Sequence, residues 1–504
     1  MRAALGGGKY FDGKSLTFHP GDTEVTHATR AGGSDAHGGI GPAGARATRF
    51  DRSRKWDSKM ADMPEKPAKH MVITTFIAAA GYHREAWRRP ESRAEELGRF
   101  SLVKDMVLMA EAAKIDSVFF GDISSGETYR NQHMSSSGLN EPVSLMGALS
   151  AVTSKIGLSG TISTSYSYPY QTARQLCGID NLSGGRAGWN IVTSSNGNEN
   201  FGMDVMPPRE ERYARAFEFV EACVQLWDSW SDDAVLVDRE SGRWVDPDLM
   251  RTINYEGKYY KVKGPFNMRR SPQGHPVLFQ SGQSPEGMHL AAKYADGVYT
   301  AQNRMEESIE TMAAYRPLLE REGRDPDSLK ILPGLLPILG ETRKEAEEFA
   351  EELANNINWP VGLAQLQNMT SLDLSKFDLD DRIPDEAWEH PTKAPTSRAR
   401  IFKRYSEEGA TIRDLIVQTS RSGGHQWAVG TASDIADIMV EWFENKACHG
   451  FNLNPPSMPL GLERICKLLI PELQSRGYFR EEYEGDTLRD HFGLPYPKAW
   501  DQQD

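Results

Sequence analysis

The sequence predicts an α/β protein whose core is a (β/α)8 TIM barrel. Three observations lead to this fold class. Eight short apolar runs of strand length occur between residues 72 and 456, and most of them are separated by runs of helical periodicity. Alternating strands and helices are typical of parallel α/β folds, and eight such strands close a barrel. The chain has 504 residues, which is enough for this fold with additions, because the barrel alone takes about 250 residues.

The expected strands are rich in β-branched and aromatic residues and end at Gly, Pro or polar residues. They are 72–80, 117–122, 156–164, 187–193, 276–282, 297–302, 329–339 and 450–456. The expected helices carry apolar residues at helical spacing. They are 101–114, 142–154, 169–185, 210–230, 285–295, 306–322, 343–357, 432–447 and 460–477.

Two long segments account for much of the length beyond the barrel. Residues 231–270, between the fourth and fifth strands, contain the polar and turn-rich sequence WSDDAVLVDRESGRWVDPD. Residues 358–430, between the seventh and eighth strands, contain PTKAPTS and a pair of glycines. Long insertions after barrel strands usually form a substrate lid. We therefore expect lid-forming insertions after strands 4 and 7.

The first 70 residues differ from the rest in composition. They are rich in Gly, Ala and charged residues and show no apolar periodicity, which is typical of a disordered segment. The expected organisation is a disordered extension at 1–70 and one barrel domain at 71–504. Translation in the cell could instead begin at Met60 or Met71. The acidic residues in the extension argue against a transit peptide.

Composition and charge narrow the functional class. The formal net charge of −13 makes a nucleic-acid surface a poor expectation. No apolar run approaches the roughly 20 residues that span a bilayer, and the first residues contain no signal-peptide core. The four cysteines lie far apart, without the spacing of a zinc site or a disulfide framework. We expect a cytoplasmic protein with no metal and no membrane or nucleic-acid partner.

The common motifs of independent catalytic machinery are missing from the sequence. No GxGxxG follows a strand, and there is no P-loop, HExxH or GxSxG sequence. This pattern suits an enzyme in which a bound cofactor supplies the chemistry.

One stretch, LSGGRAGWNIVTSS at 182–195, joins a turn to a strand with a polar end. Its glycines suit the end of a helix, and Thr193 and two serines follow the apolar strand. Ligands of parallel α/β proteins bind at the carboxyl ends of strands, so this strand end could contact one. The residues fit equally well with a capped helix, a turn and an ordinary buried strand.

The same stretch resembles the signature of the flavin-dependent monooxygenases related to nitrilotriacetate monooxygenase component A and dibenzothiophene-sulfone monooxygenase, within the bacterial luciferase-like superfamily. Further blocks agree with this resemblance from about Met71 to Leu494. They are GYHREAWRRP, SVFFGD, EERY, NYEGKYYKVKGPFN, SPQGHPVLFQSGQSPEG and GFNLNPP. The resemblance implies a luciferase-like barrel and the oxygenase component of a two-component system. It further implies reduced FMN from an NAD(P)H:flavin reductase, O2 and a small organic substrate as reactants, and a homodimer or homotetramer.

The resemblance also implies which residues contact FMN. Those assigned to the ring are Asp122, Thr161, Ser163, Asn190 and Thr193, and those assigned to the phosphate side are Arg209, Tyr213, Ser281, Gly282 and Ser284. From the residues alone, Ser284 is an N-cap and Pro285 a first helical residue, so the helix start is either an anion site or a plain cap. Relatives usually carry His where Arg209 stands, although Arg can still bind phosphate.

The resemblance places a substrate-side group after the first strand. His83 is the candidate catalytic residue, able to hydrogen-bond the oxygenated flavin or the substrate. Phe76, Trp87 and Phe120 are the candidate pocket residues, although such aromatic residues are most often simply core. Two alternatives remain open at this point: a deazaflavin (F420)-dependent oxidoreductase of the same superfamily, or a non-catalytic flavin-binding protein.

Overall fold

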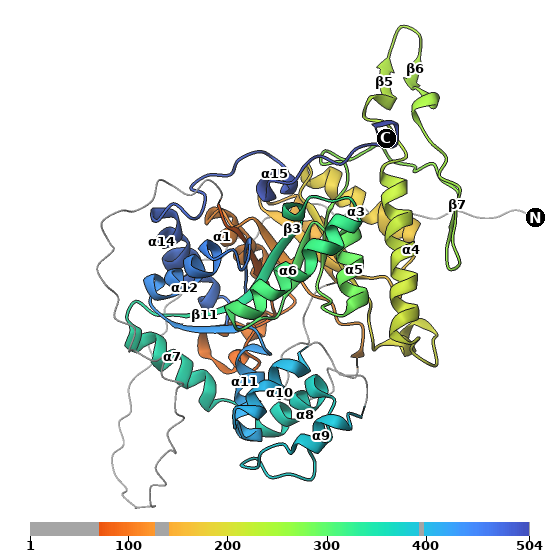
Figure 1. Ribbon diagram of the computed structural model, residues 1–504. Helices are drawn as coiled ribbons and strands as arrows, with labels where there is room; N and C mark the ends of the chain where they lie inside the picture. The colour runs from red at the N-terminus through yellow and green to blue at the C-terminus, as the bar shows by residue number, and fades with distance from the viewer. Residues whose placement is uncertain (1–69, 127–140, 393–397, 503–504) are drawn as a thin grey trace, which may run out of the picture. The chain divides into compact units, whose positions relative to one another are not determined.

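Eight parallel strands form a closed ring in the residues that the computed structural model describes, 70–126, 141–392 and 398–502 (Figure 1). Hydrogen bonding runs in the order β10-β9-β4-β3-β2-β1-β13-β11, and β11 pairs back with β10. The strands of the ring are β1 (Val72–Phe76), β2 (Ser117–Phe120), β3 (Gly157–Ser163), β4 (Ala187–Val192), β9 (Val277–Gln280), β10 (Gly297–Thr300), β11 (Lys330–Leu339) and β13 (Gly450–Leu453). The predicted barrel is confirmed, with every expected strand present and somewhat shorter.

Helices follow the strands and surround the ring. They are α1 (Phe100–Ala112), α2 (Pro142–Ser150), α3 (Pro169–Ser183), α4 (Arg209–Trp227), α5 (Pro285–Tyr294), α6 (Met305–Arg321), α7 (Arg343–Asn355) and α12 (Ala432–Glu444). Three of them begin with Pro, whose missing N–H costs nothing at a first helical position. The last helical run consists of α13 (Leu460–Arg464), a π-helical turn (Ile465–Leu469) and α14 (Ile470–Ser475). No helix in the described ranges is both long and apolar enough to cross a membrane.

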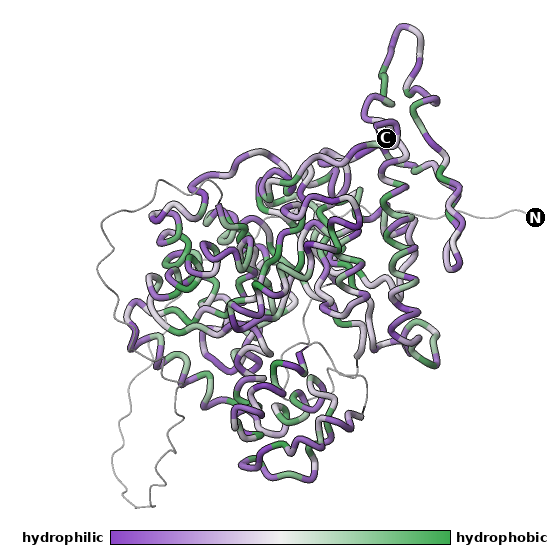
Figure 2. The backbone as a smooth tube through the Cα atoms, viewed as in Figure 1, coloured by the Kyte–Doolittle hydropathy of each residue, from purple (hydrophilic) through white to green (hydrophobic). Residues whose placement is uncertain are grey.

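The inside of the ring is filled by side chains that alternate along the strands. Phe119, Val277, Phe279 and Leu332 belong to one buried cluster with Phe492. Phe492 lies on the short helix α15 (Leu488–Phe492), which closes the amino-terminal end of the ring. Hydrophobic residues concentrate along the central strands and the helices packed on them (Figure 2). The carboxyl-terminal end is therefore the end at which a site can open.

The sequence does not predict one of the strands. β12 (Gln426–Gly430) pairs in parallel with residues 335–339 of β11, which run on from Leu335, the last residue of β11 that pairs with β13 in the ring. The first four residues of β11 pair with β10, and the remainder runs on past it. The ten-residue length of β11 makes room for this additional neighbour.

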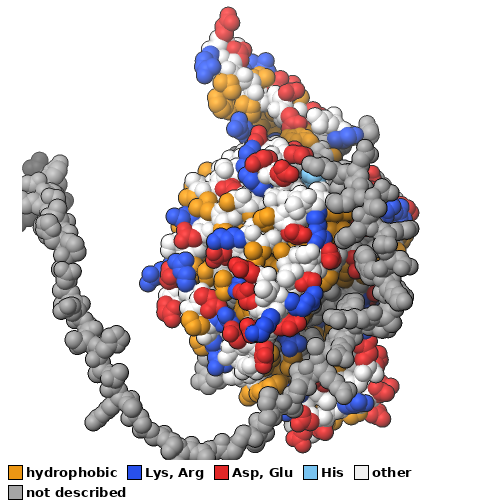
Figure 3. Space-filling model, turned by 90° about the vertical axis from the view of Figure 1, so that its left-hand side faces the viewer, with side chains coloured by type: hydrophobic (Ala, Val, Ile, Leu, Met, Phe, Trp, Pro, Cys, Tyr) orange, Lys and Arg blue, Asp and Glu red, His pale blue; other side chains and the backbone are white. Residues whose placement is uncertain are grey.

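The insertion at 231–270 consists of two antiparallel ribbons. They are β5 (Val235–Asp238) with β6 (Arg243–Val245), and β7 (Tyr255–Glu256) with β8 (Lys261–Val262). The expectation that this segment forms a lid is wrong, because α4 first returns the chain to the amino-terminal end of the strands. The segment adjoins the chain's last residues there: Trp500 N–H donates to the Asp228 carbonyl, and the β5–β6 hairpin projects beside the C-terminus (Figure 1). The projecting hairpin also carries hydrophobic side chains at its surface (Figure 3).

The insertion at 358–430 is a small helical unit with a core of its own. It comprises α8 (Trp359–Thr370), α9 (Asp385–Glu389), α10 (Ala399–Glu407) and α11 (Ile412–Ser422). Leu366, Phe402 and Leu415 are buried within it. The unit contacts the loop after β10, where Asn303 Nδ2 donates to the Tyr405 hydroxyl over 2.7 Å. It therefore stands at the carboxyl-terminal end of the barrel, at the opposite end from the ribbons.

Candidate active site

The ends of β3 and β4 present polar side chains inside the ring. Asn190 Nδ2 donates to Thr161 Oγ1 over 2.8 Å, and that hydroxyl donates to the Phe120 carbonyl over 2.9 Å. Asn190 is 7% exposed, and its Oδ1 has no hydrogen-bond partner among the described residues. Buried polar atoms are almost always hydrogen-bonded, so this acceptor suits a ligand that donates an N–H.

The other residues predicted at these strand ends lie nearby. The Ser163 hydroxyl is buried and accepts from Ser165 N–H over 3.2 Å. The half-buried Thr193 follows β4, and its carbonyl accepts from Arg212 Nη1 over 2.8 Å. Asp122 follows β2 and is exposed at the same end of the barrel. These side chains border the mouth, but their contacts alone do not single out a ligand.

The start of α5 forms the most defined anion-binding feature of the site. Ser284 caps the helix by accepting from Gly287 N–H over 3.2 Å, as its sequence position predicts. The Tyr213 hydroxyl of α4 lies against the same turn, since a Cβ atom added at Gly282 would sit 2.5 Å from it. Ser281, immediately before Gly282, is exposed. A hydroxyl, a glycine turn and the free amides of a helix start are together suited to a phosphate.

Two arginines border this turn in different ways. Arg209 is exposed at the first position of α4, and its Nε lies 4.0 Å from Glu286 Oε2. Arg212, one turn further along α4, donates to the carbonyls of Thr193 and Ser194 and to that of Pro207. Arg212 thus holds the loop after β4 in place, a role that its sequence context does not predict. Arg209 remains close enough to α5 to assist an anion there.

The loop after β1 is tied to the loop after β13. Gly81 has φ +133°, and a Cβ atom there would lie 2.5 Å from the Pro456 carbonyl oxygen, so only glycine allows this approach. Tyr82 N–H donates to the Pro455 carbonyl over 2.8 Å, and His83 N–H donates to that of Pro456 over 3.0 Å. These bonds fix the backbone position of His83.

His83 is a buried, neutral histidine with one free ring nitrogen. It is 1% exposed, and its Nδ1 accepts from Glu85 N–H over 3.3 Å. That bond puts the ring proton on Nε2, which has no partner among the described residues. Burial, with smaller contributions from Arg421 and Arg84, lowers the pKa of His83 to about 3. The ring is therefore a hydrogen-bond donor rather than a cation at neutral pH.

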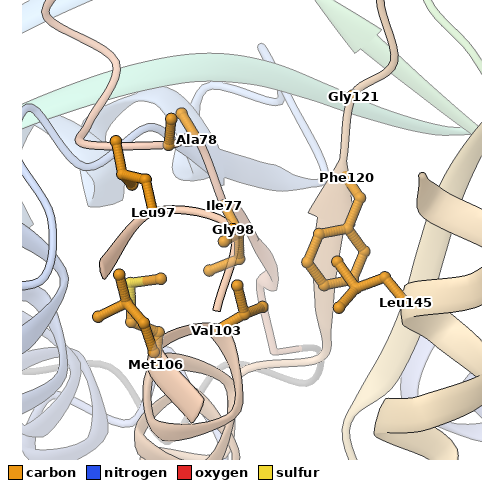
Figure 4. Close-up of a pocket in the computed structure, with 11 residues that line it drawn as sticks. Ile77, Ala78, Leu97, Gly98, Val103, Met106, Phe120, Gly121 and Leu145 are labelled. Carbon is orange, nitrogen blue, oxygen red and sulfur yellow. The ribbon is translucent and has the colours of Figure 1, made fainter. Parts of the chain in front are cut away.

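The predicted aromatic residues separate into two places. The Phe76 ring lies at the mouth, 6.2 Å from Phe119 and 6.0 Å edge-on from Tyr82. Phe120 points to the outer face of the sheet instead. There it lines an apolar pocket with Ile77, Met106 and Leu145 (Figure 4). Phe119 is thus the neighbour that faces Phe76 inside the barrel.

Trp87 follows His83 on a short 3-10 turn (Ala86–Arg88). It is half-buried, and its indole N–H has no partner within the described part of the chain.

The turn before β4 is structural. Arg186 is 2% exposed and donates to the carbonyls of Ser183, Thr153 and Ile156. These bonds satisfy groups at the amino-terminal end of the barrel, away from the mouth. Only the far end of the LSGGRAGWNIVTSS stretch, from Asn190 onward, reaches the candidate site. Within the described ranges, no group of three or more His, Cys, Asp or Glu side chains is placed to hold a metal ion.

Comparison with known proteins identifies the family. The family model described as luciferase-like monooxygenase matches residues 72–447. The chain belongs to the luciferase-like monooxygenase family. It is 41% identical to N-acetyl-S-(2-succino)cysteine monooxygenase of Bacillus subtilis (strain 168), over 85% of this chain and 98% of that protein. It is 37% identical to nitrilotriacetate monooxygenase component A of Aminobacter aminovorans, again over 85% and 98%.

A solved structure agrees with this assignment. Riboflavin lyase, described with modified FMN and riboflavin, superposes with a TM-score of 0.77 at 27% identity, covering 86% of this chain and 98% of that one. The F420-dependent tetrahydromethanopterin reductase of Methanopyrus kandleri is distant, with a TM-score of 0.51 at 14% identity over 80% and 99%, and shares the fold alone. This member of the family is thus an oxidoreductase of the monooxygenase type.

Beside Tyr82, the residue before His83, the structure brings together residues that the sequence does not single out. The Tyr299 hydroxyl, inside the ring on β10, lies 3.1 Å from His425 Nε2 and donates to Asn454 Oδ1 over 3.0 Å. Arg398 Nη2 lies 3.0 Å from the same histidine nitrogen. Because Arg398 and His425 come from the helical insertion and the segment after it, no local motif could have indicated this contact.

Proposed function

We propose that this chain is the oxygenase component of a two-component flavin-dependent monooxygenase. It binds reduced FMN that a separate NAD(P)H:flavin reductase supplies, and with O2 it oxygenates a small organic substrate. The observation that carries the proposal is the pairing of two features at one mouth. They are the unpartnered Asn190 Oδ1 inside the ring, and the Ser284-capped helix start with the Tyr213 hydroxyl against it.

The residues at the mouth suit both the ring and the phosphate of FMN. The Asn190 amide oxygen suits the N–H at the pyrimidine edge of the ring, with Thr161 holding the amide in place. The phosphate suits the start of α5, with Ser284 and Tyr213 as hydroxyl contacts. The further candidate contacts are Asp122, Ser163, Thr193, Arg209, Ser281 and Gly282. Reduced FMN, when bound, supplies the electrons that activate O2; the protein positions the reactants and excludes water.

On the opposite side of the mouth, His83 is the proposed catalytic residue. Its neutral ring offers an Nε2–H donor inside a buried site, so it can hold an oxygen atom of a reactant without changing the charge of the site. Phe76 and Trp87 border this side and exclude water. Phe120 faces away, and we assign it no contact with the reactants.

The proposal extends to organisation and partners. Because the sequence has no dinucleotide motif, NAD(P)H oxidation belongs to another protein. The name "component A" of the Aminobacter aminovorans relative supports such a division. We further propose that residues 71–504 are the catalytic domain and that 1–70 are an extension not needed for it. The protein would act in the cytoplasm as a homodimer or homotetramer.

The names of the relatives indicate several different substrates. Their names include carboxylate-bearing compounds, nitrilotriacetate and N-acetyl-S-(2-succino)cysteine, but also riboflavin. Of the two alternatives, F420 use rests on a shared fold only. A non-catalytic flavin-binding role predicts FMN binding without any oxygenated product.

Binding and turnover with a separate reductase test the proposal. Anaerobic titration should show tight binding of reduced FMN, and the purified protein alone should not oxidise NADH when FMN is added. With a flavin reductase present, NADH consumption should lead to an oxygenated product for at least one member of a substrate panel, followed by mass spectrometry. Steady NADH oxidation by the protein alone would contradict the proposal, and H2O2 as the sole product would favour the non-catalytic role.

A further inference from the structure

Three arginines converge beside His83 from separate parts of the chain. Arg84 follows His83 in the loop after β1, Arg398 lies just before α10, and Arg421 lies in the last turn of α11. Arg421 and Arg84 both act electrostatically on His83, and Arg398 acts on Arg84. We call Arg84, Arg398 and Arg421 the arginine cluster. All three arginines are half-buried, whereas His83 and His425 are buried.

The arginine cluster has little negative charge to balance it. Among the described residues, no carboxylate oxygen lies within 4.0 Å of a guanidinium nitrogen of the three arginines. Glu85 is the acidic side chain that acts electrostatically on Arg84, less strongly than Tyr82 and Arg398 do. Burial lowers the pKa of Arg84 and of Arg421, because desolvation of a guanidinium is not offset by a close carboxylate. Burial acts on Arg398 in the same direction, but Tyr82 and Tyr299 outweigh it and raise the pKa of Arg398. Half-buried cations without anions are costly, which favours an anion that binds among them.

The contacts of the cluster leave hydrogen-bond donors available. Arg398 donates to the Gly423 carbonyl over 2.9 Å and lies against His425, which orients its guanidinium. Arg421 lies over the Trp427 ring at 5.6 Å, and its Nε has no partner among the described residues. Trp427 in turn lies 6.5 Å from the His83 ring. Arg421 and His83 therefore both lie beside Trp427, and Arg398 lies against His425, two positions before it in the chain.

The cluster is separate from the expected phosphate end of FMN. Ser284 and Tyr213 belong to the β9–α5 turn and to α4, whereas the cluster comes from the loop after β1 and from the helical insertion between β11 and β12. In the ring, β9 and β1 are separated by three strands on one side and three on the other. A flavin anchored at α5 with its ring at Asn190 therefore leaves the cluster free for a second ligand.

We propose that the arginine cluster binds carboxylate groups of the substrate, so that the substrate is a small organic anion with two or more carboxylates. This inference rests on the proposed function, because it assigns the cluster to the reactant that is oxygenated beside His83. Guanidinium groups match carboxylates in a paired geometry, and several of them together select for a polyanion. Arg398 and Arg421 come from the helical insertion, so that unit supplies the specificity of the site.

The test uses tricarballylate, a tricarboxylate, and its neutral triamide as probes. Calorimetric titration of the FMN-loaded full chain should show binding of tricarballylate that is at least about tenfold tighter than that of the triamide. Arg421→Gln should weaken tricarballylate binding roughly 10- to 150-fold, and Arg421→Lys should restore part of it. Arg413→Gln is the matched control: Arg413 lies on the same helix but pairs with Asp380, and its loss should leave the affinity unchanged.

Each outcome decides between separate claims. Equal binding of the triamide, an unchanged affinity in Arg421→Gln, or inorganic phosphate binding as tightly as tricarballylate would overturn the carboxylate assignment. FMN affinity of every variant, measured separately, checks that the fold is intact. If FMN binds but tricarballylate does not, only this inference fails. If tricarballylate binds but reduced FMN does not, the proposed function fails and the anion site stands.

Discussion

The two insertions of this barrel both follow a strand and its helix in the sequence, but they lie at opposite ends of the barrel. Both follow a helix of the βα repeat, α4 for the ribbons at 231–270 and α7 for the helical unit at 358–430, but only the helical unit leads into a strand that extends the sheet. The ribbons join the amino-terminal end of the barrel, whereas the helical unit packs at the carboxyl-terminal end and places Arg421 near His83 and Arg398 near Arg84. The end of the barrel that an insertion reaches therefore depends on where the preceding helix ends: α4 ends beside the last residues of the chain, whereas α7 packs on β11 and β12.

The two insertions also differ in how they are stabilised. The helical unit buries its own apolar core, including Phe402 and Leu415. The outer ribbon leaves Trp244 66% exposed and Val237 37% exposed. A unit with a core can hold charged side chains in fixed positions, while a two-stranded ribbon alone is marginally stable in water.

The largest expected effect is in the core of the helical unit. Phe402→Ala should lower the free energy of unfolding of that unit by about 3–5 kcal/mol, because it leaves a cavity at a fully buried position. Urea unfolding followed by circular dichroism measures the loss. Weaker tricarballylate binding with unchanged FMN affinity should accompany it. An effect on FMN as large as that on tricarballylate would show that the helical unit does not act on the substrate side alone.

The next effect concerns the flavin end of the site, which neither insertion supplies. Ser284→Ala and Tyr213→Phe should each weaken reduced-FMN binding roughly 10- to 150-fold, since each removes one hydrogen bond to a charged phosphate. Riboflavin, which has no phosphate, is the control and should bind nearly as before. Some loss at Ser284 reflects the helix cap itself, typically about 1 kcal/mol. If both ligands weaken equally, the phosphate does not bind at this helix start.

The pH dependence of stability tests whether His83, on the substrate side of the site, is neutral in the folded protein. The folded pKa of about 3 lies below the unfolded value of 6.5, so the unfolded chain binds the proton first and stability falls as pH drops through this window. Above pH 6.5, His83 makes its full contribution to the free energy of unfolding. Below pH 6.5, the free energy of unfolding falls by about 1.4 kcal/mol for each pH unit. His83→Gln should therefore lose less stability than the wild type between pH 6.5 and 5, by about 2 kcal/mol. Parallel pH profiles of thermal unfolding would contradict a neutral His83.

The β5–β6 ribbon should tolerate amino-acid substitutions better than the core of the helical unit does. Trp244→Ser, on the exposed β6, should change the free energy of unfolding by no more than about 0.5 kcal/mol. Reductase-coupled turnover should stay the same, because the ribbon lies away from the mouth. A marked loss of turnover, or a change in mass measured by light scattering, would mean that the ribbon supports the site through another copy of the chain.

The smallest expected effect is at the start of the chain. Because residues 1–70 lack a core-forming pattern, a chain that begins at Met60 should match the full chain in thermal stability and FMN affinity. Loss of folding or of FMN binding would show that the extension belongs to the catalytic domain.

The sequence predicted the strands of the ring because each is a short apolar run between helical patterns, a signal that is local. It also predicted the Ser284 cap, because a cap is read from adjacent residues. It did not distinguish Phe119 from Phe120, since an apolar run such as SVFF gives no alternation to show which side faces inward. It also missed β12, because this short run lies at the end of the segment 358–430, which the sequence predicts as an insertion and not as part of the sheet.

The arginine cluster could not be predicted from the sequence, for a different reason. Arg84 and Arg398 are more than 300 positions apart, and only the closure of the barrel and the folding of the helical unit bring them together. A single sequence gives no signal for such a contact. The resemblance to the family predicted the candidate FMN contacts, whereas the proposed substrate contacts depend on the helical unit at 358–430.

Isotope labelling tests the central claim most directly. The protein, a flavin reductase, NADH and FMN would be incubated under 18O2 with a panel of small carboxylates and sulfur compounds, and the products analysed by mass spectrometry. The account predicts that the oxygenated product gains one 18O atom and that its formation depends on the reductase and on FMN. Oxidised products without the label, or H2O2 as the only product across the panel, would contradict a monooxygenase that uses reduced FMN.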